Sequence, residues 1–542
     1  MIKKRIFIAN DASCLNTGYG IYGKEILTRL HNSGKYDVAE LGCYIDKNHP
    51  ATSTIPWKFY PNAVSGDDPQ HQKYASNNIN QFGLWRFNKA VANFKPHIVF
   101  DVRDYWMFSY QETSPLRPFF HWVIMPTVDS APQKLEWRYT FSNADIVVPY
   151  TQWAKKTLIK ECGNSINLFP KCAYAGINPN EFFPLENKTQ HKIQYFGKDI
   201  TVVGAVMRNQ KRKLLPDLML SFKKYLELLK SNNLDKEYQN TYLYLHTSYP
   251  EENGWDIPAL LLEYGIADRV YFSYLCRNCG SFLPSKFQGA IKRCIKCNTY
   301  SSVVSSPING VNTSQLNEIY NLFDIFVQYA ICEGFGMPQV EAAACGLKIA
   351  SVDYSAMSEI VDTLDGISLP VQRMFRETET NADRAYPDVD ATAQKIYDYL
   401  IKTSQEYKTE NSAVIRNKCI ENYTWDNVYK TWESCFDSID IKNKADWGSP
   451  PIETNHNNVQ VPPNLTHKEF VEFVCYNVLK APYILNSAAI QCLIKDLSMG
   501  LVAGGGSIKS ISREQAVKTL ESHLNNILYG NELRLNNIKE DF

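Results

Sequence analysis

The sequence predicts an α/β protein with parallel sheets in two successive halves, and three observations support this. Short apolar stretches typical of buried strands alternate with amphipathic helical segments over most of the chain. The alternation begins again near Ile200, after a proline-bounded loop, AGINPNEFFP, that ends at Pro184. Because strands that alternate with helices form parallel sheets with crossover helices, each half is expected to contain one such sheet.

The first half is expected to open with a buried strand, a glycine-containing loop and an amphipathic helix. Further buried strands follow at intervals that suit crossover helices. These elements are expected at Arg5–Ala9, Ile21–Leu30, Asp37–Ile45, His97–Asp101 and Asp145–Val148.

The second half repeats the pattern, with strands rich in β-branched and aromatic residues. Its strands are expected at 201–207, 241–247, 269–275, 324–330 and 348–352, and its helices at 214–229, 314–323, 338–345, 390–404 and 425–440. We expect an N-terminal domain at 1–190 and a second domain at 191–445.

A polar, proline-rich stretch predicts a linker at 446–464. Beyond it, Thr466 and Glu469 form the pattern of a capping box, and a second helical stripe runs from Val517 to Leu528. A small helical domain is therefore expected at 465–542.

The composition excludes several simple classes of protein. The 542 residues are 44% apolar and 21% charged, which favours folded cores over a disordered chain. Basic and acidic residues number 57 each, so bulk charge gives no basis for coating nucleic acid or membranes, although a local basic patch remains open. No apolar stretch approaches the roughly 18 residues of a transmembrane helix, and MIKKRIFIAN suits a buried first strand better than a signal peptide. Mostly scattered cysteines indicate reduced thiols in a cytoplasmic protein.

Gly18, Gly20 and Gly23 match the pattern G-x-G-x-x-G, and Asp46 follows the second expected strand. A nicotinamide dinucleotide site is one interpretation. It requires the first glycine in the tight turn directly after the strand, whereas seven residues separate Asn10 from Gly18. We favour a glycine loop at a helix N-terminus, where backbone amides approach a ligand.

An acidic motif, CEGFGMPQVEAAACG, follows the expected strand at 324–330. Glu333 is expected on the loop at the carboxyl end of that strand, where ligands bind in open α/β sheets. Glu341 is expected in the first turn of the next helix. Two favourable charges near a helix N-terminus are the alternative, which explains Glu341 but not a second acid on the glycine-rich loop.

A basic motif, RNQKRK, starts at Arg208 and ends at Lys213, after the strand TVVGAVM. Four cations in six residues at the carboxyl end of a strand suit a pyrophosphate, because arginine and lysine both bind phosphate oxygens. A solvated basic turn is the alternative. The acidic motif on the same predicted sheet edge favours the phosphate site.

Two C-x2-C pairs, separated by fourteen residues, predict an inserted zinc ribbon at 276–297. The four thiolates of a structural Zn2+ site would come from Cys276, Cys279, Cys294 and Cys297. An iron–sulfur cluster or core cysteines are the alternatives. The insertion contains five cations, no acid, and aromatic residues at Phe282 and Phe287, which would suit a nucleic-acid contact. We slightly favour a small rigid hairpin that packs on its own domain. Contact of the insertion with the acceptor or with another subunit is a third interpretation.

The motifs resemble those of a known family. EGFGMPQVE, with Glu333 and Glu341 in an E-x7-E spacing, is similar to the signature of retaining nucleotide-sugar glycosyltransferases of family 4. VGAVMRNQKRK resembles the phosphate-binding segment of that family. ADIVVPYTQWAKKTLIKECG, YAGINPNEFFP, SQLNEIYNLFDIFVQYAICEGFG and ACGLKIASVDYSAMSEIV extend the similarity over roughly residues 1–440 without the cysteine insertion. The resemblance implies two Rossmann-like domains in the GT-B arrangement.

The resemblance also implies roles for four charged residues. Arg208 and Lys213 would hold the donor diphosphate and stabilise the charge on the leaving group, so that no catalytic metal is needed. Glu341 would bind the hydroxyls of the donor ribose. Glu333 would lie beside the sugar and support the positive charge that builds at the anomeric carbon.

Backbone and loop positions receive implied roles as well. Gly18 and Gly20 would let a loop of the first domain close over the phosphates. By this resemblance Asp129, in MPTVDS, falls where many members of the family carry a histidine, and would bind a sugar hydroxyl, assist the acceptor or cap its loop. Backbone amides would hold the sugar at Gly334, Phe335, Gly336 and Met337.

The predicted function is retaining transfer of a sugar from a nucleoside diphosphate sugar to an acceptor hydroxyl. A saccharide, a lipid-linked saccharide or a hydroxymethylated base in DNA are candidate acceptors, and a homo-oligomer is possible. Two alternatives remain open at this stage. One is an NAD-dependent oxidoreductase built on Gly18 to Gly23 and Asp46, and the other is a nucleic-acid-binding protein that uses the zinc ribbon.

Overall fold

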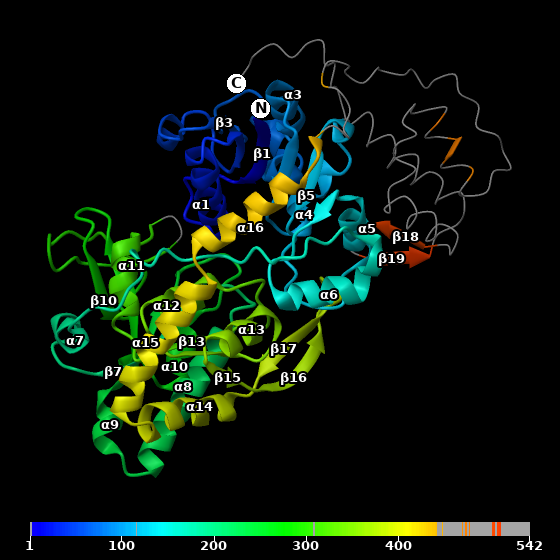
Figure 1. Cartoon of the computed structure of the whole chain (residues 1–542). Helices are drawn as coiled ribbons and strands as arrows, with labels where there is room; N and C mark the ends of the chain where they lie inside the picture. The colour runs from blue at the N-terminus through cyan, green and yellow to red at the C-terminus, as the bar shows by residue number, and fades with distance from the viewer. Residues whose placement is uncertain are drawn as a thin grey trace. The chain divides into compact units, whose positions relative to one another are not determined.

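A computed structural model describes residues 3–114, 116–306 and 309–441, together with Trp447, Glu469, Glu472, Phe473, Tyr476, 501–504 and 507–510 (Figure 1). Two compact units share these residues. The first unit contains the described residues up to Ala173, Thr378–Ala382, and those from Tyr429 onward. The second contains Tyr174–Glu377 and Asp383–Val428.

The first unit is built on a parallel sheet in the order β3-β2-β1-β4-β5-β6. The interiors of its strands are apolar and buried, as expected where helices cover both faces of a parallel sheet. The strands are β1 (Lys4–Asp11), β2 (Tyr36–Cys43), β3 (Lys58–Pro61), β4 (Ile98–Asp101), β5 (His121–Ile124) and β6 (Ile146–Val147).

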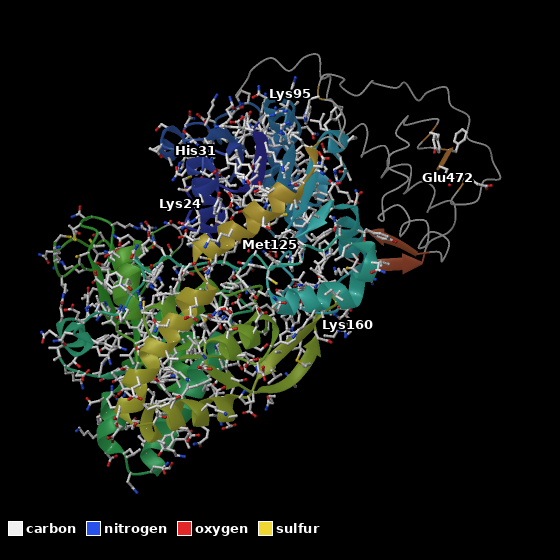
Figure 2. All side chains as sticks on the ribbon, in the orientation of Figure 1. Lys24, His31, Lys95, Met125, Lys160 and Glu472 are labelled. Carbon is white, nitrogen blue, oxygen red and sulfur yellow. The ribbon has the colours of Figure 1, made fainter. Side chains whose placement is uncertain are left out.

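Amphipathic helices connect these strands and keep their charged side chains on the solvent side. Lys24 and His31 on α1 and Lys160 on α6 are exposed, whereas Met125, directly after β5, is buried (Figure 2). The helices are α1 (Gly18–Asn32), α2 (His71–Ala75), α3 (Phe87–Phe94), α4 (Tyr105–Phe108), α5 (Leu135–Asn143) and α6 (Gln152–Cys162), with 3-10 turns at Pro50–Ser53, Asn78–Phe82, Ser109–Gln111, Arg117–Phe119 and Gly163–Ser165.

The second unit repeats the same strand order, β9-β8-β7-β13-β14-β15, in a parallel sheet. Both parallel sheets therefore confirm the predicted fold class. The strands are β7 (Thr201–Val206), β8 (Thr241–His246), β9 (Val270–Cys276), β13 (Ile325–Gln328), β14 (Ile349–Val352) and β15 (Ile367–Leu369).

Apolar periodicity predicted some of the helices of the second unit, but not all of them. The helix predicted at 214–229, for example, is α8 (Leu215–Ser231). The others are α7 (Lys188–Phe196), α9 (Asp235–Asn240), α10 (Ile257–Tyr264), α11 (Thr313–Tyr320), α12 (Met337–Ala344), α13 (Ser355–Thr363), α14 (Val389–Tyr397) and α15 (Gln405–Asn422), with a 3-10 turn at Ala267–Arg269 and a π turn at Asp398–Lys402.

Two antiparallel additions extend the second unit. The cysteine insertion forms β10 (Phe282–Lys286), β11 (Ile291–Lys292) and β12 (Ser302–Val304), which pair with β9 or with each other, so the ribbon continues beyond the predicted end at 297. A separate hairpin joins β16 (Val371–Arg376) to β17 (Asp383–Pro387) and was not predicted.

The boundary between the units lies between Ala173 and Tyr174 rather than at the predicted position 190. The loop after Ala173 already packs on the second unit, because the Ile177 amide donates to the Tyr423 carbonyl over 2.7 Å. The ring of Phe182 also contacts that of Tyr320, at 5.9 Å between centroids. The segment looks like a linker in the sequence but contributes to the core of the second unit.

Helix α16 (Trp425–Ser438) is the point where the chain returns to the first unit, so the second domain ends before the predicted position 445. The indole of Trp432 donates to the Tyr22 hydroxyl over 2.7 Å. The ring of Phe436 packs on Phe100 of β4, with 5.1 Å between centroids. Lys4 of β1 donates to backbone carbonyls at the end of the helix. These contacts attach the end of α16 to the first sheet.

Little of the C-terminal region is described. Trp447, in the predicted linker, donates its indole N–H to the Pro96 carbonyl over 3.0 Å and packs on Phe119 at 4.9 Å. Within the predicted helical domain the structure describes an antiparallel pair, β18 (Leu501–Gly504) and β19 (Ser507–Ser510). The two helices expected there lie outside the described residues, apart from isolated helical positions at Glu469, Glu472 and Phe473. Among the described helices, none is long and apolar enough to cross a membrane.

Candidate functional site

The basic and acidic motifs lie on the loops that follow two neighbouring strands, β7 and β13. These strands are parallel and in register at Val203 and Ile325, so both loops leave the sheet at its carboxyl edge. A backbone hydrogen bond of 3.0 Å from the Ile331 amide to the Arg212 carbonyl joins the loops directly. The predicted meeting of the two motifs at one sheet edge is confirmed.

Glu333 is the centre of the charged cluster at this edge. Its side chain is only 6% exposed, and it forms ion pairs with the Lys213 ammonium and with the Arg212 guanidinium, the latter at 3.0 Å. The amide of Gln328, the last residue of β13, donates to Oε1 of Glu333 over 2.7 Å. The backbone amide of Glu333 donates to Oγ of Ser355 over 3.0 Å, which fixes the loop.

Two cations therefore share one carboxylate. Lys213 is buried, while the side chain of Arg212 is 42% exposed and presents part of its guanidinium to solvent. A buried carboxylate is stable only when paired, which explains the ion pairs. The excess of one positive charge remains available, and an anionic ligand with several oxygens would satisfy it.

Arg208 lies apart from this cluster. Its side chain is 55% exposed and pairs with Glu251, whose second oxygen accepts a hydrogen bond from Ser248. Of the three residues predicted to meet, Lys213 and Glu333 are in contact, whereas Arg208 pairs elsewhere. Arg212 occupies the position beside Glu333, although no individual role was predicted for it.

The glycine-rich loop shapes the start of α12. Gly336 has a φ of +87°, and a side chain on it would meet the amide of Gln339 at 2.5 Å, so this position requires glycine. Gln339 in turn donates to the Phe335 carbonyl over 3.1 Å. Within the described residues, no side chain caps the start of α12. Pro338 has no N–H and the Gln339 amide donates to the Gly336 carbonyl over 3.0 Å, so of the first three residues only Met337 offers a backbone N–H at the sheet edge.

The side chain of Phe335 packs inside the second unit. Its ring is buried against Tyr174 and Tyr423, at 6.2 and 5.7 Å between centroids. Only the backbone of Phe335 is therefore suited to contact a ligand, and the use of amides along 334–337 stays a prediction.

Glu341 lies just after the first turn of α12, in which it was predicted. The helix begins at Met337, which makes Glu341 its fifth residue. The carboxylate is buried and accepts a hydrogen bond from the Tyr320 hydroxyl over 2.6 Å. Burial raises the pKa of Glu341 to about 7, and the Tyr320 hydrogen bond opposes this shift.

The glycines of the first unit mostly serve packing. A side chain on Gly20 would meet the Leu15 carbonyl at 2.6 Å, and one on Gly23 would meet the Asn10 amide at 2.7 Å. Gly18, at the start of α1, has open space around it. Asp46 accepts hydrogen bonds from neighbouring residues of its own loop region, the Asn48 amide and the Ser65 hydroxyl.

The turn demanded by a dinucleotide fingerprint does not form here. Strand β1 ends at Asp11, and a separate loop precedes α1, which begins at Gly18 with Thr17 as its N-cap. The three glycines therefore lie inside the helix. Gly18 is the member of this pattern that retains room for a ligand.

Asp129 lies on the loop after β5 and is half-buried. It accepts a hydrogen bond of 2.8 Å from the adjacent Ser130 hydroxyl. This contact suits the predicted loop cap and leaves the predicted sugar contact as a hypothesis.

An aromatic surface in the first unit was missed by sequence reasoning. Trp106 on α4 is exposed, and its ring lies 6.3 Å from that of Trp137 on α5. Tyr105 packs on Trp137 at 5.7 Å, and the Lys134 ammonium lies 5.7 Å from the same indole ring. These residues come from loops and helices after β4 and β5, so no periodic pattern in the sequence indicated their proximity.

The four cysteines of the insertion meet as predicted. Their sulfur atoms all lie within 4.8 Å of one another, with 3.5 Å between Cys276 and Cys297 and 3.7 Å between Cys279 and Cys294. A tetrahedral site with metal–sulfur bonds of about 2.3 Å has edges of about 3.8 Å, so the cluster could hold a metal ion.

Matching turns build the two halves of the cluster. The amide of Gly280 donates to the Cys276 carbonyl over 2.9 Å, and the amide of Asn298 donates to the Cys294 carbonyl over 3.0 Å. Gly280 and Asn298 both have a left-handed backbone, with φ of +67° and +60°. Each C-x2-C pair is therefore followed by the same kind of tight turn.

Phe282 and Phe287 of the ribbon both pack on other parts of the second unit. Phe282 is buried and packs on Tyr195 at 5.1 Å, and the half-buried Phe287 packs on Phe272 at 5.6 Å. These contacts suit the slightly favoured hairpin that packs on its domain better than the alternative in which the two rings stack on bases.

Comparison with known proteins agrees with this architecture. Residues 307–372, which include Glu333 and Glu341, match the family model described as glycosyl transferases group 1. No curated protein matches the chain in sequence.

Solved structures match over most of the chain. Sucrose-phosphate synthase from Thermosynechococcus elongatus aligns with a TM-score of 0.58 and 15% identity, covering 80% of this chain and 98% of that one. HepE from Anabaena in complex with UDP-glucose aligns with a TM-score of 0.54 and 12% identity, covering 80% and 100%. A glycosyltransferase from Rickettsia africae gives 0.54 and 13%, covering 81% and 98%. With its two Rossmann-like sheets, the chain has the GT-B fold.

Proposed function

We propose that the protein is a retaining glycosyltransferase that moves a sugar from a nucleoside diphosphate sugar to an acceptor hydroxyl. The observation that carries this proposal is the contact of Lys213 and Arg212 with Glu333 on the joined loops after β7 and β13. The match of 307–372 to glycosyl transferases group 1 supports it, and so does the fold shared with HepE, which is solved in complex with UDP-glucose.

The diphosphate of the donor binds at the basic loop. Lys213 and Arg212 carry two charges against the one of Glu333, and the exposed Arg208 supplies a third cation when it leaves its pair with Glu251. In the transition state the leaving diphosphate gains negative charge, which these cations stabilise without a catalytic metal. Because Lys213 and Arg212 are held by Glu333 beforehand, little reorganisation is needed when the donor binds.

Glu333 and Glu341 hold the two carbohydrate parts of the donor. Glu333 accepts hydrogen bonds from sugar hydroxyls and offsets positive charge at the anomeric carbon, and Glu341 accepts hydrogen bonds from the ribose. The uncapped Met337 amide at the start of α12 binds an oxygen of the same ligand. The acceptor attacks the face from which the diphosphate leaves, so the anomeric configuration is retained.

We propose a saccharide as the acceptor in preference to a base in DNA. The exposed ring of Trp106, with Trp137 beside it, offers an apolar face on which the C–H side of a sugar ring packs. Glu136 lies 3.9 Å from Lys134 at this surface and offsets its charge, so the surface lacks the positive excess that a phosphate backbone requires.

We further propose that the four-cysteine cluster holds one structural Zn2+. Four thiolates complete a tetrahedral site and leave no position for substrate. Reduced thiolates of this kind suit the cytoplasm. The expected result is one equivalent of zinc per chain by elemental analysis, and none in a Cys294→Ser, Cys297→Ser double variant; purified wild-type protein with iron instead of zinc would contradict the assignment.

A panel of nucleoside diphosphate sugars tests the main proposal. The wild-type protein is expected to hydrolyse or transfer from at least one donor, and Lys213→Met is expected to lower kcat about 10²- to 10³-fold, as loss of a preorganised charge does. Glu333→Gln is expected to lower kcat as well.

Lys211→Met is the matched control, because Lys211 lies in the same loop but is exposed. It should retain nearly full activity. If Lys213→Met and Glu333→Gln keep wild-type rates, the site assignment is wrong; if no donor is turned over or bound by the wild type, the function is wrong.

A further inference from the structure

The metal-binding end of the ribbon forms a single exposed surface, which we call the knuckle surface and define by Arg277, Arg293, Ile295, Lys296 and Tyr300. The Arg277 amide donates to the Ser301 carbonyl over 3.0 Å, so Arg277 of the first C-x2-C turn lies next to Tyr300. Arg293 donates its Nε–H to the Asn298 carbonyl over 3.1 Å across the second turn. The cysteine cluster holds the two turns together.

This surface exposes apolar side chains to an unusual degree. Ile295 is 77% exposed inside the tight turn that follows Cys294, and Tyr300 is 73% exposed on the segment that leaves this turn. A rigid turn cannot fold such a side chain back onto the protein, so its apolar area remains in water unless a partner covers it. Single exposed apolar residues are ordinary, but two on one small rigid surface indicate an interaction site.

The charge of the surface has one sign. From Cys276 to Asn317 the chain contains five cations and no aspartate or glutamate. One of them, Lys292, is buried over the ring of Tyr274 at 4.5 Å, and the other four are exposed. Three of these four, Arg277, Arg293 and Lys296, belong to the knuckle surface. A partner of this surface therefore carries negative charge.

The mixture of charge and apolar groups discriminates between two anionic partners. Single-stranded nucleic acid binds to successive aromatic rings, but Phe282 and Phe287 are packed inward and only Tyr300 remains at the surface. An aliphatic side chain such as Ile295 gains nothing against a phosphodiester backbone. At an anionic bilayer, however, it enters the boundary between headgroups and acyl chains while neighbouring cations bind lipid phosphates.

We propose that the knuckle surface binds anionic phospholipid bilayers. Ile295 and Tyr300 enter the interface, and Arg277, Arg293 and Lys296 contact the headgroups. This function is additional to glycosyl transfer and does not depend on it, since it concerns a surface far from the Glu333 loop in sequence and can be measured without a donor.

Cosedimentation with vesicles tests the proposal on the full-length, zinc-loaded protein. Binding is expected to equimolar phosphatidylcholine and phosphatidylglycerol, and to be much weaker to phosphatidylcholine alone. Lys296→Gln is expected to weaken binding about fivefold, because one cation near an anionic surface contributes ~1 kcal/mol. Ile295→Ser is expected to weaken binding about tenfold, through lost apolar burial.

The chain offers matched controls for both changes. Lys286 is an exposed cation of β10 that pairs with Tyr271, near the opposite end of β9 from Cys276, and Lys286→Gln should leave binding unchanged. Leu262 on α10 is 78% exposed, as Ile295 is, and Leu262→Ser should also leave binding unchanged.

Several outcomes would overturn the proposal. Equal binding to neutral and anionic vesicles, or no binding to either, would do so. Equal losses of vesicle binding in the two control variants would also overturn it, because binding would then depend on the general charge and hydrophobicity of the protein and not on the knuckle surface. Binding of a DNA oligonucleotide at the same salt concentration, without binding to vesicles, would assign the surface to nucleic acid instead.

Discussion

The two units place a carboxylate–cation pair at the same edge of similar sheets, but they enclose the pairs differently. In the first unit Asp101, the last residue of β4, binds Arg103 through two hydrogen bonds of 2.9 and 2.5 Å, and both side chains are fully buried. In the second unit Glu333, after β13, binds Lys213 and the partly exposed Arg212. Strands β4 and β13 hold equivalent positions, next to β1 and β7.

The two pairs differ in the groups that accept the remaining hydrogen bonds of the arginine. The remaining donors of Arg103 are directed at the Phe82 carbonyl and the Cys43 sulfur, and Gln111 donates to Asp101, so protein atoms complete that network. Arg212 keeps part of its guanidinium in solvent. A closed pair of this kind supports the fold, whereas an open one can exchange its water for a ligand.

The largest effect is expected when the closed pair is broken. Asp101→Ala leaves the Arg103 guanidinium buried without its counter-ion, and the free energy of unfolding should fall by ~3–5 kcal/mol. Denaturant unfolding measures this change. A loss below about 1 kcal/mol would mean that water enters and solvates Arg103, so that the two pairs would not differ as described.

The next effect concerns pH and the buried glutamates of both units. Burial raises the pKa of Glu40, in the first unit, and of Glu341, in the second, to about 7. Between the ordinary value of 4.5 and about 7, the unfolded chain has lost these protons while the folded chain keeps them. Stability should therefore fall as the pH rises through this window.

Substituting either glutamate tests this expectation. Glu341→Gln should remove a decrease on the order of 2–3 kcal/mol between pH 5 and pH 8, at ~1.4 kcal/mol per pKa unit. Glu40→Gln should flatten the same curve separately, since the two residues belong to different units. Denaturant unfolding curves are recorded across this pH range. If the stability of both variants depends on pH as that of the wild type does, the raised pKa values of the two glutamates are wrong.

A smaller effect is expected for the open pair. Arg212→Ala should change the free energy of unfolding by less than ~1 kcal/mol, because Lys213 and Gln328 still contact Glu333. It should nevertheless weaken pyrophosphate binding about tenfold, because a charge-assisted contact is lost. Titration calorimetry with pyrophosphate measures the second change; a stability loss as large as that of Asp101→Ala would show that the pair is structural.

The smallest effect concerns Arg208. Glu251→Gln removes the carboxylate that pairs with the exposed Arg208 and frees the guanidinium for a phosphate. A pair with one solvent-exposed partner contributes ~0.2–1 kcal/mol, so pyrophosphate should bind up to about fivefold more tightly. Weaker binding after this change would place Arg208 outside the donor site.

The sequence predicted most strands of both parallel sheets, because burial of short apolar strands is a local property that periodicity reveals, but it missed β3, β5 and β15. It also placed Glu333 and the basic loop at one sheet edge, since loops after neighbouring parallel strands leave on the same side. Side-chain partners were harder to predict. Arg212 and Arg208 lie four residues apart in the same loop, and only the hydrogen bond between Arg212 and Ile331 decides which of them reaches Glu333.

The sequence by itself determined the α/β class, the two motifs and the cysteine cluster, because each depends on residue type and spacing along a short segment. Only the tertiary structure decided that Gly20 and Gly23 pack against β1 and its loop, that Phe282 and Phe287 turn inward, and that the chain changes units at Ala173. These features depend on which distant segment covers a side chain, and that is fixed by the packing of the whole core.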